Sequence, residues 1–249
     1  MIKHIVVPID FSDCSLNALE YAIKFALAME IKPKLTILNA YSIPLAYADM
    51  DISFGPGIEL EQVEALIDKE FDSLQKQVPM LKEIAYEAVK INHQLTYAIE
   101  RYHVDHKIDL IFMGTSGASG LKGRIMGSNT FKVITGMIAP VFVVPTDAKY
   151  QSIKNIGFAN DYQGLLPEAL LPLKDICQRY NATLHIVHID KDGILEPQET
   201  DKAKNLNLFI KDLPHKFHLI EDVAVELGLN KFLQEQAVDL MVTLTRNKG

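Results

Sequence analysis

The chain has 249 residues, of which 48% are hydrophobic and 23% charged, as is ordinary for a globular protein that buries a real core. The formal net charge is −7 and no cluster of Lys and Arg supplies a basic face, which argues against nucleic acid as a partner. No apolar run approaches the roughly twenty residues that a membrane-spanning helix needs, so no membrane association is predicted.

The two cysteines are far apart in the sequence and have no CxxC spacing. Cys14 and Cys177 therefore indicate free thiols in a reducing compartment rather than a disulfide. A cytoplasmic protein is the expectation.

Short apolar, β-branched runs alternate with longer segments of helical periodicity, which is typical of a parallel sheet flanked by helices. Ser12 is a candidate N-cap for the first of these helices. Strands are expected over 5–9, 35–40, 84–91, 109–113 and 141–144, and helices over 16–29, 59–77, 95–106 and 129–137.

The pattern then restarts, which predicts an internal duplication. Three segments are echoed in the same order: 3–10 by 154–161, 35–41 by 184–190, and 108–113 by 238–243. We expect an α/β fold of two tandem Rossmann-like open parallel sheets, in domains 1–146 and 152–249. The second copy lacks a counterpart of the last helix and strand, so either the sequence is cut short or this copy has decayed.

A glycine-rich stretch, from Gly114 to Thr130, follows the buried strand 109–113 and precedes a helix. Ligands of α/β sheets bind outside the carboxyl ends of the strands, and glycines there let the backbone approach an anion. The N–H groups of Gly127 and Ser128 at the helix N-terminus are predicted to point toward a phosphate. The alternative is a loop whose glycines serve only as turns, with Ser128 as a plain N-cap.

The spacing Gly114-x-x-Gly117, nine residues, Gly127-Ser128 resembles the ATP-binding signature GxxGx₉G[ST] of the universal stress protein family. The first strand, which ends in Val7-Pro8-Ile9-Asp10, is similar to that family as well. The resemblance implies a fold of the adenine nucleotide α-hydrolase-like group, and the tandem arrangement is similar to that of two-domain members.

The resemblance also implies a site for ATP, accompanied by Mg²⁺ held mainly through phosphate oxygens and water. It assigns Pro8, Ile9 and Asp10 to the nucleoside, with the Asp10 carboxylate as a partner of the ribose, and the main chain of Ala40 to adenine. The residues it assigns to the phosphates and their surroundings are Met113, Gly114, Gly117, Gly127, Ser128, Asn129 and Thr130.

The second copy departs from this pattern. Asp161 retains the acid, but Ala159 replaces the proline, and Leu244 and Asn247 stand where the first copy has Gly114 and Gly117. No nucleotide is expected there, and the domain is expected to be structural or regulatory.

Histidines suggest a metal site only weakly. His103 and His106 lie three apart on a predicted helix without an obvious third ligand, so surface histidines are the preferred interpretation. His185 and His188 lie three apart in a strand and should point to opposite faces. No metal site in the protein itself is predicted.

Two classes of function remain open. One is a non-enzymatic, ATP-binding module of the stress response whose occupancy controls a partner. The other is a slow ATP-hydrolysing enzyme of the same fold group, for which Lys122 and Arg124 are the only nearby electrophilic candidates.

The strand 141–144 is apolar and expected at a sheet edge, which must be covered. The resemblance implies that Val141 to Val144 pairs with a second copy of the chain, as a homodimer, or with another domain of the same chain.

Overall fold

The computed structural model describes residues 1–42, 60–115, 127–163 and 167–245. They form two compact units, Ile2–Tyr150 and the part of the chain from Gln151 onward. Each unit is built on its own sheet, in which every strand pairing is parallel. The predicted fold class, two Rossmann-like parallel sheets flanked by helices, is confirmed.

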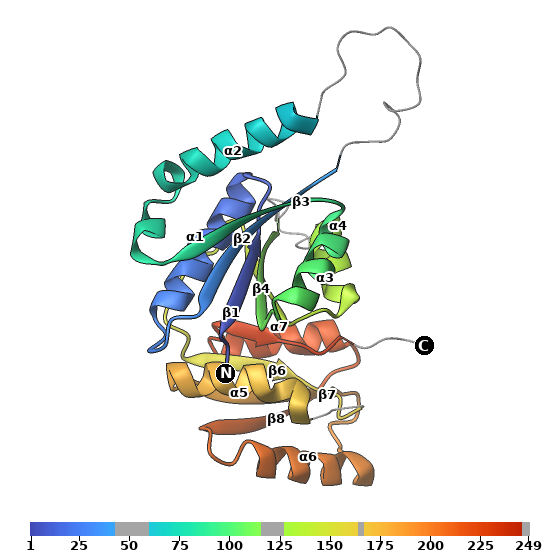
Figure 1. Ribbon diagram of the computed structural model, residues 1–249. Coiled ribbons are helices and arrows are strands. Elements are labelled where there is room, and N and C mark those ends of the chain that lie inside the picture. The colour runs from blue at the N-terminus through green and yellow to red at the C-terminus, as the bar shows by residue number, and fades with distance from the viewer. Residues whose placement is uncertain (43–59, 116–126, 164–166, 246–249) are drawn as a thin grey trace, which may run out of the picture. The chain divides into compact units, whose positions relative to one another are not determined.

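In the first unit the sheet has the strand order β3-β2-β1-β4-β5. Helices α1 and α2 lie on one side of it, and α3 and α4 on the other (Figure 1). The strands are β1 (His4–Pro8), β2 (Lys34–Tyr41), β3 (Tyr86–Asn92), β4 (Leu110–Thr115) and β5 (Val141–Pro145). The helices are α1 (Asp13–Leu27), α2 (Leu60–Gln77), the 3₁₀ helix η2 (Pro79–Glu83), α3 (Leu95–Asp105) and α4 (Ser128–Gly136).

Successive residues of the strands in the first sheet point alternately to its two faces. All five residues of β1 are buried, because both faces of this central strand are covered by helices. Val6, Leu38 and Ile111 point to one face and pack with Ile99 of α3 and Val133 of α4 in a single cluster. The strand β5 is at the edge of the sheet, as the sequence predicted.

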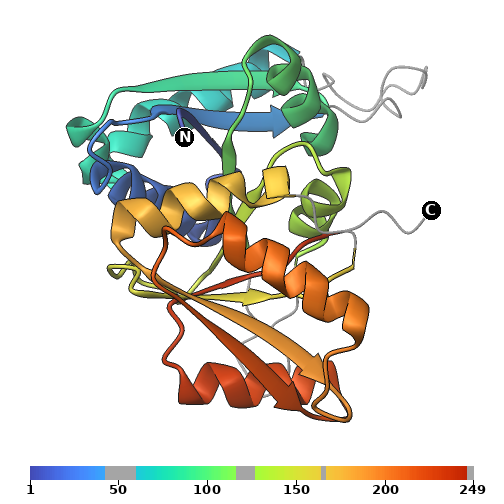
Figure 2. The same ribbon diagram turned by 90° about the horizontal axis from the view of Figure 1, so that it is seen from below.

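In the second unit the strand order is β8-β7-β6-β9. Helix α7 lies on one side of this sheet, and α5 and α6 on the other (Figure 2). The elements are β6 (Asn155–Ala159), the 3₁₀ helix η3 (Pro167–Leu170), α5 (Leu171–Tyr180), β7 (Thr183–Asp190), α6 (Pro197–Phe209), β8 (His215–Glu221), α7 (Val225–Glu235) and β9 (Leu240–Val242).

Matched contacts reveal the duplication that the sequence predicted. Asp109 Oδ2 accepts hydrogen bonds from the main-chain N–H groups of Lys3 and His4, at 2.9 and 3.0 Å. Asp239 Oδ2 does the same for the two residues at the start of β6, at 2.8 and 2.9 Å. The two aspartates occupy equivalent positions in the echoed segments, so the units share more than strand order.

Both cysteines are free thiols in the structure. Cys177 is fully buried in α5, and this burial raises the pKa of its thiol to about 12. Within the described ranges, no helix combines the length and the apolar character that crossing a membrane requires.

Candidate functional site

The carboxyl ends of β1 and β4 form the point at which the first sheet reverses its strand order. The chain runs from β1 outward to β2 and β3, then returns to the other side of β1 as β4. Such a switch point opens a crevice between neighbouring strand ends, where α/β proteins bind ligands. Asp10 follows β1 and Gly114 lies near the end of β4, so the sequence-predicted residues are brought to one edge.

The turn after β1 is held in an unusual conformation. Pro8 and Ile9 are buried, and Phe11 has a φ of +61°, in the left-handed region that side chains disfavour. The chain then enters α1 with Ser12 as N-cap, whose side chain accepts the Ser15 N–H at 3.3 Å. The predicted N-cap is confirmed, and the turn aims Asp10 out of the sheet.

Asp10 is exposed and partly engaged by the turn that follows it. Its Oδ1 accepts the Ser12 hydroxyl at 2.6 Å and the Ser12 N–H at 3.1 Å. Desolvation raises the pKa of the Asp10 carboxyl, but hydrogen bonds from Ser12 and Ser15 outweigh it and hold the pKa below its ordinary value. At neutral pH Asp10 is therefore a carboxylate that accepts hydrogen bonds and is a weak base.

At the end of β2, Ala40 is half-buried and packs against the core, leaving its main chain at the sheet edge. The preceding residue, Asn39, was not singled out from the sequence. Its Nδ2 donates to the Ile9 carbonyl at 2.8 Å and thereby ties β2 to the turn after β1. Asn39 Oδ1 is buried without a hydrogen-bond partner among the described residues.

Packing within the protein accounts for Met113 and Gly114 at the end of β4, where the sequence suggested contact with a ligand. The Met113 side chain is only 5% exposed and lies in the core, so only its main chain can serve the edge. A Cβ at Gly114 would lie 2.4 Å from the carbonyl oxygen of Cys14 and 2.6 Å from its Sγ. The missing side chain at 114 therefore lets the first turn of α1 pack onto β4, and a close ligand is not needed to explain it.

The first turn of α4 leaves its N–H groups without side-chain caps. Gly127 is the N-cap, with no side-chain cap, and the nearest atom of the described residues to a Cβ there would be Thr130 Oγ1 at 3.9 Å. The first main-chain hydrogen bond of the helix runs from Phe131 N to the Gly127 carbonyl at 3.0 Å. The N–H groups of Ser128 and Asn129, both exposed residues, precede it and have no acceptor in the helix. Ser128 is thus not the N-cap that the sequence allowed as an alternative.

Thr130 holds this helix start in place. Its side chain is 2% exposed, and Oγ1 donates to the Gly114 carbonyl at 3.0 Å. The hydroxyl is therefore used within the protein, and Thr130 joins α4 to β4 rather than offering a donor of its own.

Three expected residues of this edge, Gly117, Lys122 and Arg124, fall within 116–126 and lie outside the described residues. In the described part of the chain, no three His, Cys, Asp or Glu side chains are grouped so as to hold a metal ion. The Nδ1 of His103 accepts the Ile108 N–H at 3.1 Å, which gives this histidine a structural contact.

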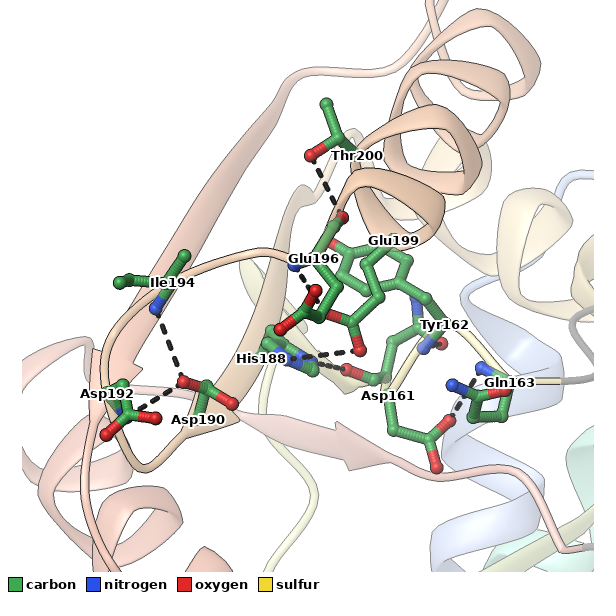
Figure 3. A network of polar contacts seen from close by, with 11 residues as sticks. Asp161, Tyr162, Gln163, His188, Asp190, Asp192, Ile194, Glu196, Glu199 and Thr200 are labelled. Carbon is green, nitrogen blue, oxygen red and sulfur yellow. Dashed lines mark hydrogen bonds and ion pairs between the residues drawn. The ribbon is translucent and has the colours of Figure 1, made fainter.

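The second unit repeats the turn that follows β1, but not the other features at the carboxyl edge of the first sheet. Tyr162 has a φ of +57°, matching Phe11, and Asp161 Oδ1 accepts the Gln163 N–H at 3.0 Å. His188 takes the place of Asn39, and its Nδ1 bonds the Asn160 carbonyl at 2.9 Å. Figure 3 shows Asp161, His188 and Glu199 near one another at this strand edge. Leu244 stands at the position of Gly114.

Both units therefore define a class of doubly wound α/β proteins whose polar side chains gather at the carboxyl ends of the central strands. Comparison with known sequences identifies the family. The chain matches the universal stress protein family over residues 1–145 and belongs to it.

Two curated relatives are similar to the first unit. A universal stress protein of Methanocaldococcus jannaschii is 29% identical over 153 residues, which are 59% of this chain and 84% of the relative. Universal stress protein YxiE of Bacillus subtilis is 27% identical over 149 residues, which are 58% of this chain and 99% of the relative.

Solved structures extend the likeness of fold to nearly the whole chain. A universal stress protein from Archaeoglobus fulgidus matches with a TM-score of 0.69 at 18% identity, over 96% of this chain and 86% of that one. A protein of unknown function from Pseudomonas aeruginosa, PA1789, matches with a TM-score of 0.55 at 14% identity, over 99% of this chain and 84% of that one.

Proposed function

We propose that the first unit binds ATP, with Mg²⁺, at the carboxyl edge of its sheet, and that the occupied site makes the protein a regulatory module of the cytoplasmic stress response. The observation that carries the proposal is the uncapped first turn of α4, which is joined to the end of β4 at the switch point beside Asp10. Membership of the universal stress protein family supports it.

The start of α4 fits a phosphate group. The N–H groups of Ser128 and Asn129 are donors without helix acceptors, and the helix dipole adds an attraction for negative charge. Among the described residues, the nearest atom to a Cβ at Gly127 is Thr130 Oγ1 at 3.9 Å, so these residues leave room for the phosphate to reach the two N–H groups. In this proposal Gly114 and Met113 contribute main chain, Thr130 fixes the helix start, and Gly117 completes the predicted signature.

The end of β1 fits the nucleoside. The Asp10 carboxylate is ionised at neutral pH and accepts hydrogen bonds, which suits the two hydroxyls of a ribose. Pro8 and Ile9 form the buried floor beneath it, and the main chain of Ala40 offers donor and acceptor groups to adenine.

A bound Mg²⁺ would neutralise part of the phosphate charge. Asp10 is the acidic residue that we assign to this edge, and we assign it to the ribose, so the metal is held by phosphate oxygens and water. The chain's own contribution to the phosphates is the pair of N–H donors at the start of α4.

We infer a binding function rather than an enzymatic one. Asp10, whose pKa is below its ordinary value, is a poor general base. In the second unit Leu244 stands where the first unit has Gly114. We propose that this unit has a structural or regulatory role without an ATP site of its own.

We also propose that the edge strand β5 pairs with β5 of a second chain. No other strand of the described residues pairs with the outer side of Val141–Pro145, and the alternate residues of this strand are only partly buried. Light scattering on the full chain tests this pairing. The wild type is expected to be a dimer, and a charged residue in place of Val143 should dissociate it. A monomeric wild type and a monomeric variant would exclude the pairing.

Isothermal titration with MgATP tests the nucleotide site. Saturable binding of one ATP per chain is expected for the wild type, with at least tenfold weaker binding for Gly127→Val, whose side chain enters the space before the helix start. A parallel assay of phosphate release separates the two classes of function. Turnover near 1 s⁻¹, the low end of ordinary enzyme rates, would favour the enzyme over the module.

A further inference from the structure

The second unit has an apolar pocket beneath helix α6, on the face of its sheet. The pocket has a volume of about 320 Å³, at the lower end of the roughly 300–1,000 Å³ typical of small-molecule sites. Phe217 and Leu219 lie two apart in β8, so they share a face of the sheet, and both line the pocket. Each is 41% exposed, although α6 lies on this side of the sheet (Figure 2). The helix therefore leaves part of the apolar face uncovered.

The sequence of α6 explains why the space is not filled. Thr200, Ala203, Lys204 and Asn207 line the pocket, at the spacing i, i+3, i+4 and i+7 of one helix face. A helix face that packs on a sheet is usually apolar, but these four residues are small or polar. The helix is held instead through Leu206, nearer its C-terminal end, which is only 3% exposed.

The equivalent helix of the first unit has the bulk that α6 lacks. Helix α2 lies between β2 and β3 in the chain, as α6 lies between β7 and β8. In the first unit Phe71 of α2 packs edge-on against Phe11, with ring centroids 5.3 Å apart. Tyr162 has the left-handed turn position of Phe11 and lines the pocket together with α6. The pocket therefore lies between the second-unit equivalents of two segments that are packed together in the first unit.

Tyr162 supplies a polar contact to this pocket. Its side chain is 2% exposed, and its hydroxyl has no hydrogen-bond partner among the described residues. Burial, and then the charge of Glu199, raise the pKa of the hydroxyl, so it is protonated at neutral pH and can donate. A buried hydroxyl without a partner is costly, and an acceptor oxygen on a ligand would remove that cost.

The charges around the pocket favour an uncharged ligand. Among the described residues that line it, Lys204 alone has a fixed charge, and its Nζ is paired with Asp201 Oδ1 at 3.0 Å. His188 Nε2 faces the Glu199 carboxylate at 4.0 Å (Figure 3). An anion would therefore compete with carboxylates that are already in place.

We propose that this pocket binds a small, uncharged molecule of the class of aromatic ketones. Its rings lie against Phe217 and Leu219, and its carbonyl oxygen accepts a hydrogen bond from the Tyr162 hydroxyl. Rings are favoured over alkyl chains because Tyr162, His188 and Phe217 are themselves ring side chains, and ring pairs add to the gain from apolar burial. The proposal does not rest on the ATP site of the first unit.

Benzophenone is the probe, and it is titrated into the full chain and followed by methyl NMR. Saturable shifts are expected for the methyl groups of Leu195, Ala203 and Leu219, which line the pocket. Under ultraviolet light the benzophenone carbonyl also adds across nearby C–H bonds, so mass spectrometry can locate it. Labelled peptides should come from residues 195–219. Labels confined to other peptides, or no saturable binding up to the solubility limit, would overturn the proposal.

Filling the pocket should abolish binding without unfolding the protein. Ala203→Phe and Thr200→Leu add bulk on the pocket side of α6, so each should weaken benzophenone binding at least tenfold while the melting temperature stays equal or rises. Leu208→Phe is the matched control, because Leu208 is 65% exposed and does not line the pocket. The site is wrong if both filling variants bind as the wild type does, or if the control loses binding equally.

Tyr162→Phe tests the hydrogen bond. The partner probe is 1,1-diphenylethylene, which has the shape of benzophenone but a methylene group in place of the carbonyl oxygen. Loss of the hydroxyl should weaken benzophenone binding about fivefold and leave binding of the hydrocarbon unchanged. An equal effect on the two probes would exclude the Tyr162 hydroxyl as the donor and overturn the assignment to a ketone.

Discussion

Thr130 and Gly114 are joined by a hydrogen bond of 3.0 Å, from the Thr130 hydroxyl to the Gly114 carbonyl. The bond is partly buried and connects the first turn of α4 to the end of β4, 16 residues earlier in the sequence. It therefore sets where the first N–H groups of α4, which have no acceptor in the helix, lie relative to the strand end, and it links the stability of this edge to its proposed ligand.

We predict that Thr130→Val lowers both the stability of the protein and its affinity for MgATP. Valine has the shape of threonine but leaves the Gly114 carbonyl without its donor, which costs about 1–2 kcal/mol of unfolding free energy. MgATP affinity should fall several-fold because α4 is less firmly placed. Urea unfolding and calorimetry measure the two effects. Thr130→Ser retains the hydroxyl and should lie near the wild type; equal losses in both variants would remove the hydrogen bond as the cause.

Substituting alanine at each of the two glycines of this edge should show which of them is required for packing. Gly114→Ala places a Cβ 2.4 Å from a main-chain oxygen that cannot move freely, so a loss of about 2–3 kcal/mol is expected. The Cβ of Gly127→Ala would meet only Thr130 Oγ1, at 3.9 Å, among the described residues, and Gly127 has an ordinary φ of −58°, so stability should change by less than about 0.5 kcal/mol. Urea unfolding checks both, and similar values for the two variants would contradict this account.

The matched aspartates should each stabilise their own unit. Asp109→Ala removes the acceptor of two main-chain N–H groups and should cost about 1–3 kcal/mol. Asp239→Ala should cost less, since Asp239 is exposed and water can replace it. Hydrogen exchange at the starts of β1 and β6 reports each loss locally. In both cases the Asn variant keeps an acceptor oxygen and should recover most of the protection.

Acid should destabilise the second unit through a pair of histidines. His185 Nδ1 and His218 Nε2 lie 3.0 Å apart, and burial lowers the pKa of both below the ordinary 6.5. The unfolded chain therefore binds protons more readily than the folded one, so the stability is highest above pH 6.5 and falls progressively as the pH drops from about 6.5 toward the lower pKa values of the folded state.

Urea unfolding at pH 8 and at pH 5.5 measures this dependence. His218→Gln should reduce the loss on acidification, by on the order of 1 kcal/mol. His93→Gln, at an exposed position in the first unit, serves as the control and should leave it unchanged. If the two variants show the same pH dependence, the histidine pair is not its source.

The order of the elements could be predicted from the sequence because it depends on local periodicity. Val6 and its neighbours in β1 form a short apolar run, which is typical of a strand covered on both faces, and Ser12 caps α1 as its position suggested. The match of Asp109 with Asp239 in the sequence also predicted the register of the two sheets, since equivalent residues pair at equivalent strand positions.

The contacts that decide the candidate site could not be predicted in the same way. Gly114 was assigned to a ligand from its spacing, yet its environment is the main chain of Cys14, a hundred residues earlier in the sequence. Thr130 was expected near phosphates, a prediction that stays open, and the structure adds that its hydroxyl bonds the Gly114 carbonyl. Both depend on which segments pack together, which periodicity does not specify.

The sequence alone thus determined the family, the two parallel sheets and the edge at which to look for a ligand, because strand and helix patterns are local and motif spacing is linear. The tertiary structure decided which of the described residues at that edge are exposed and which are used in packing. It also revealed the pocket beneath α6, since a pocket is formed by segments that are distant in the chain and meet only when the sheet has formed.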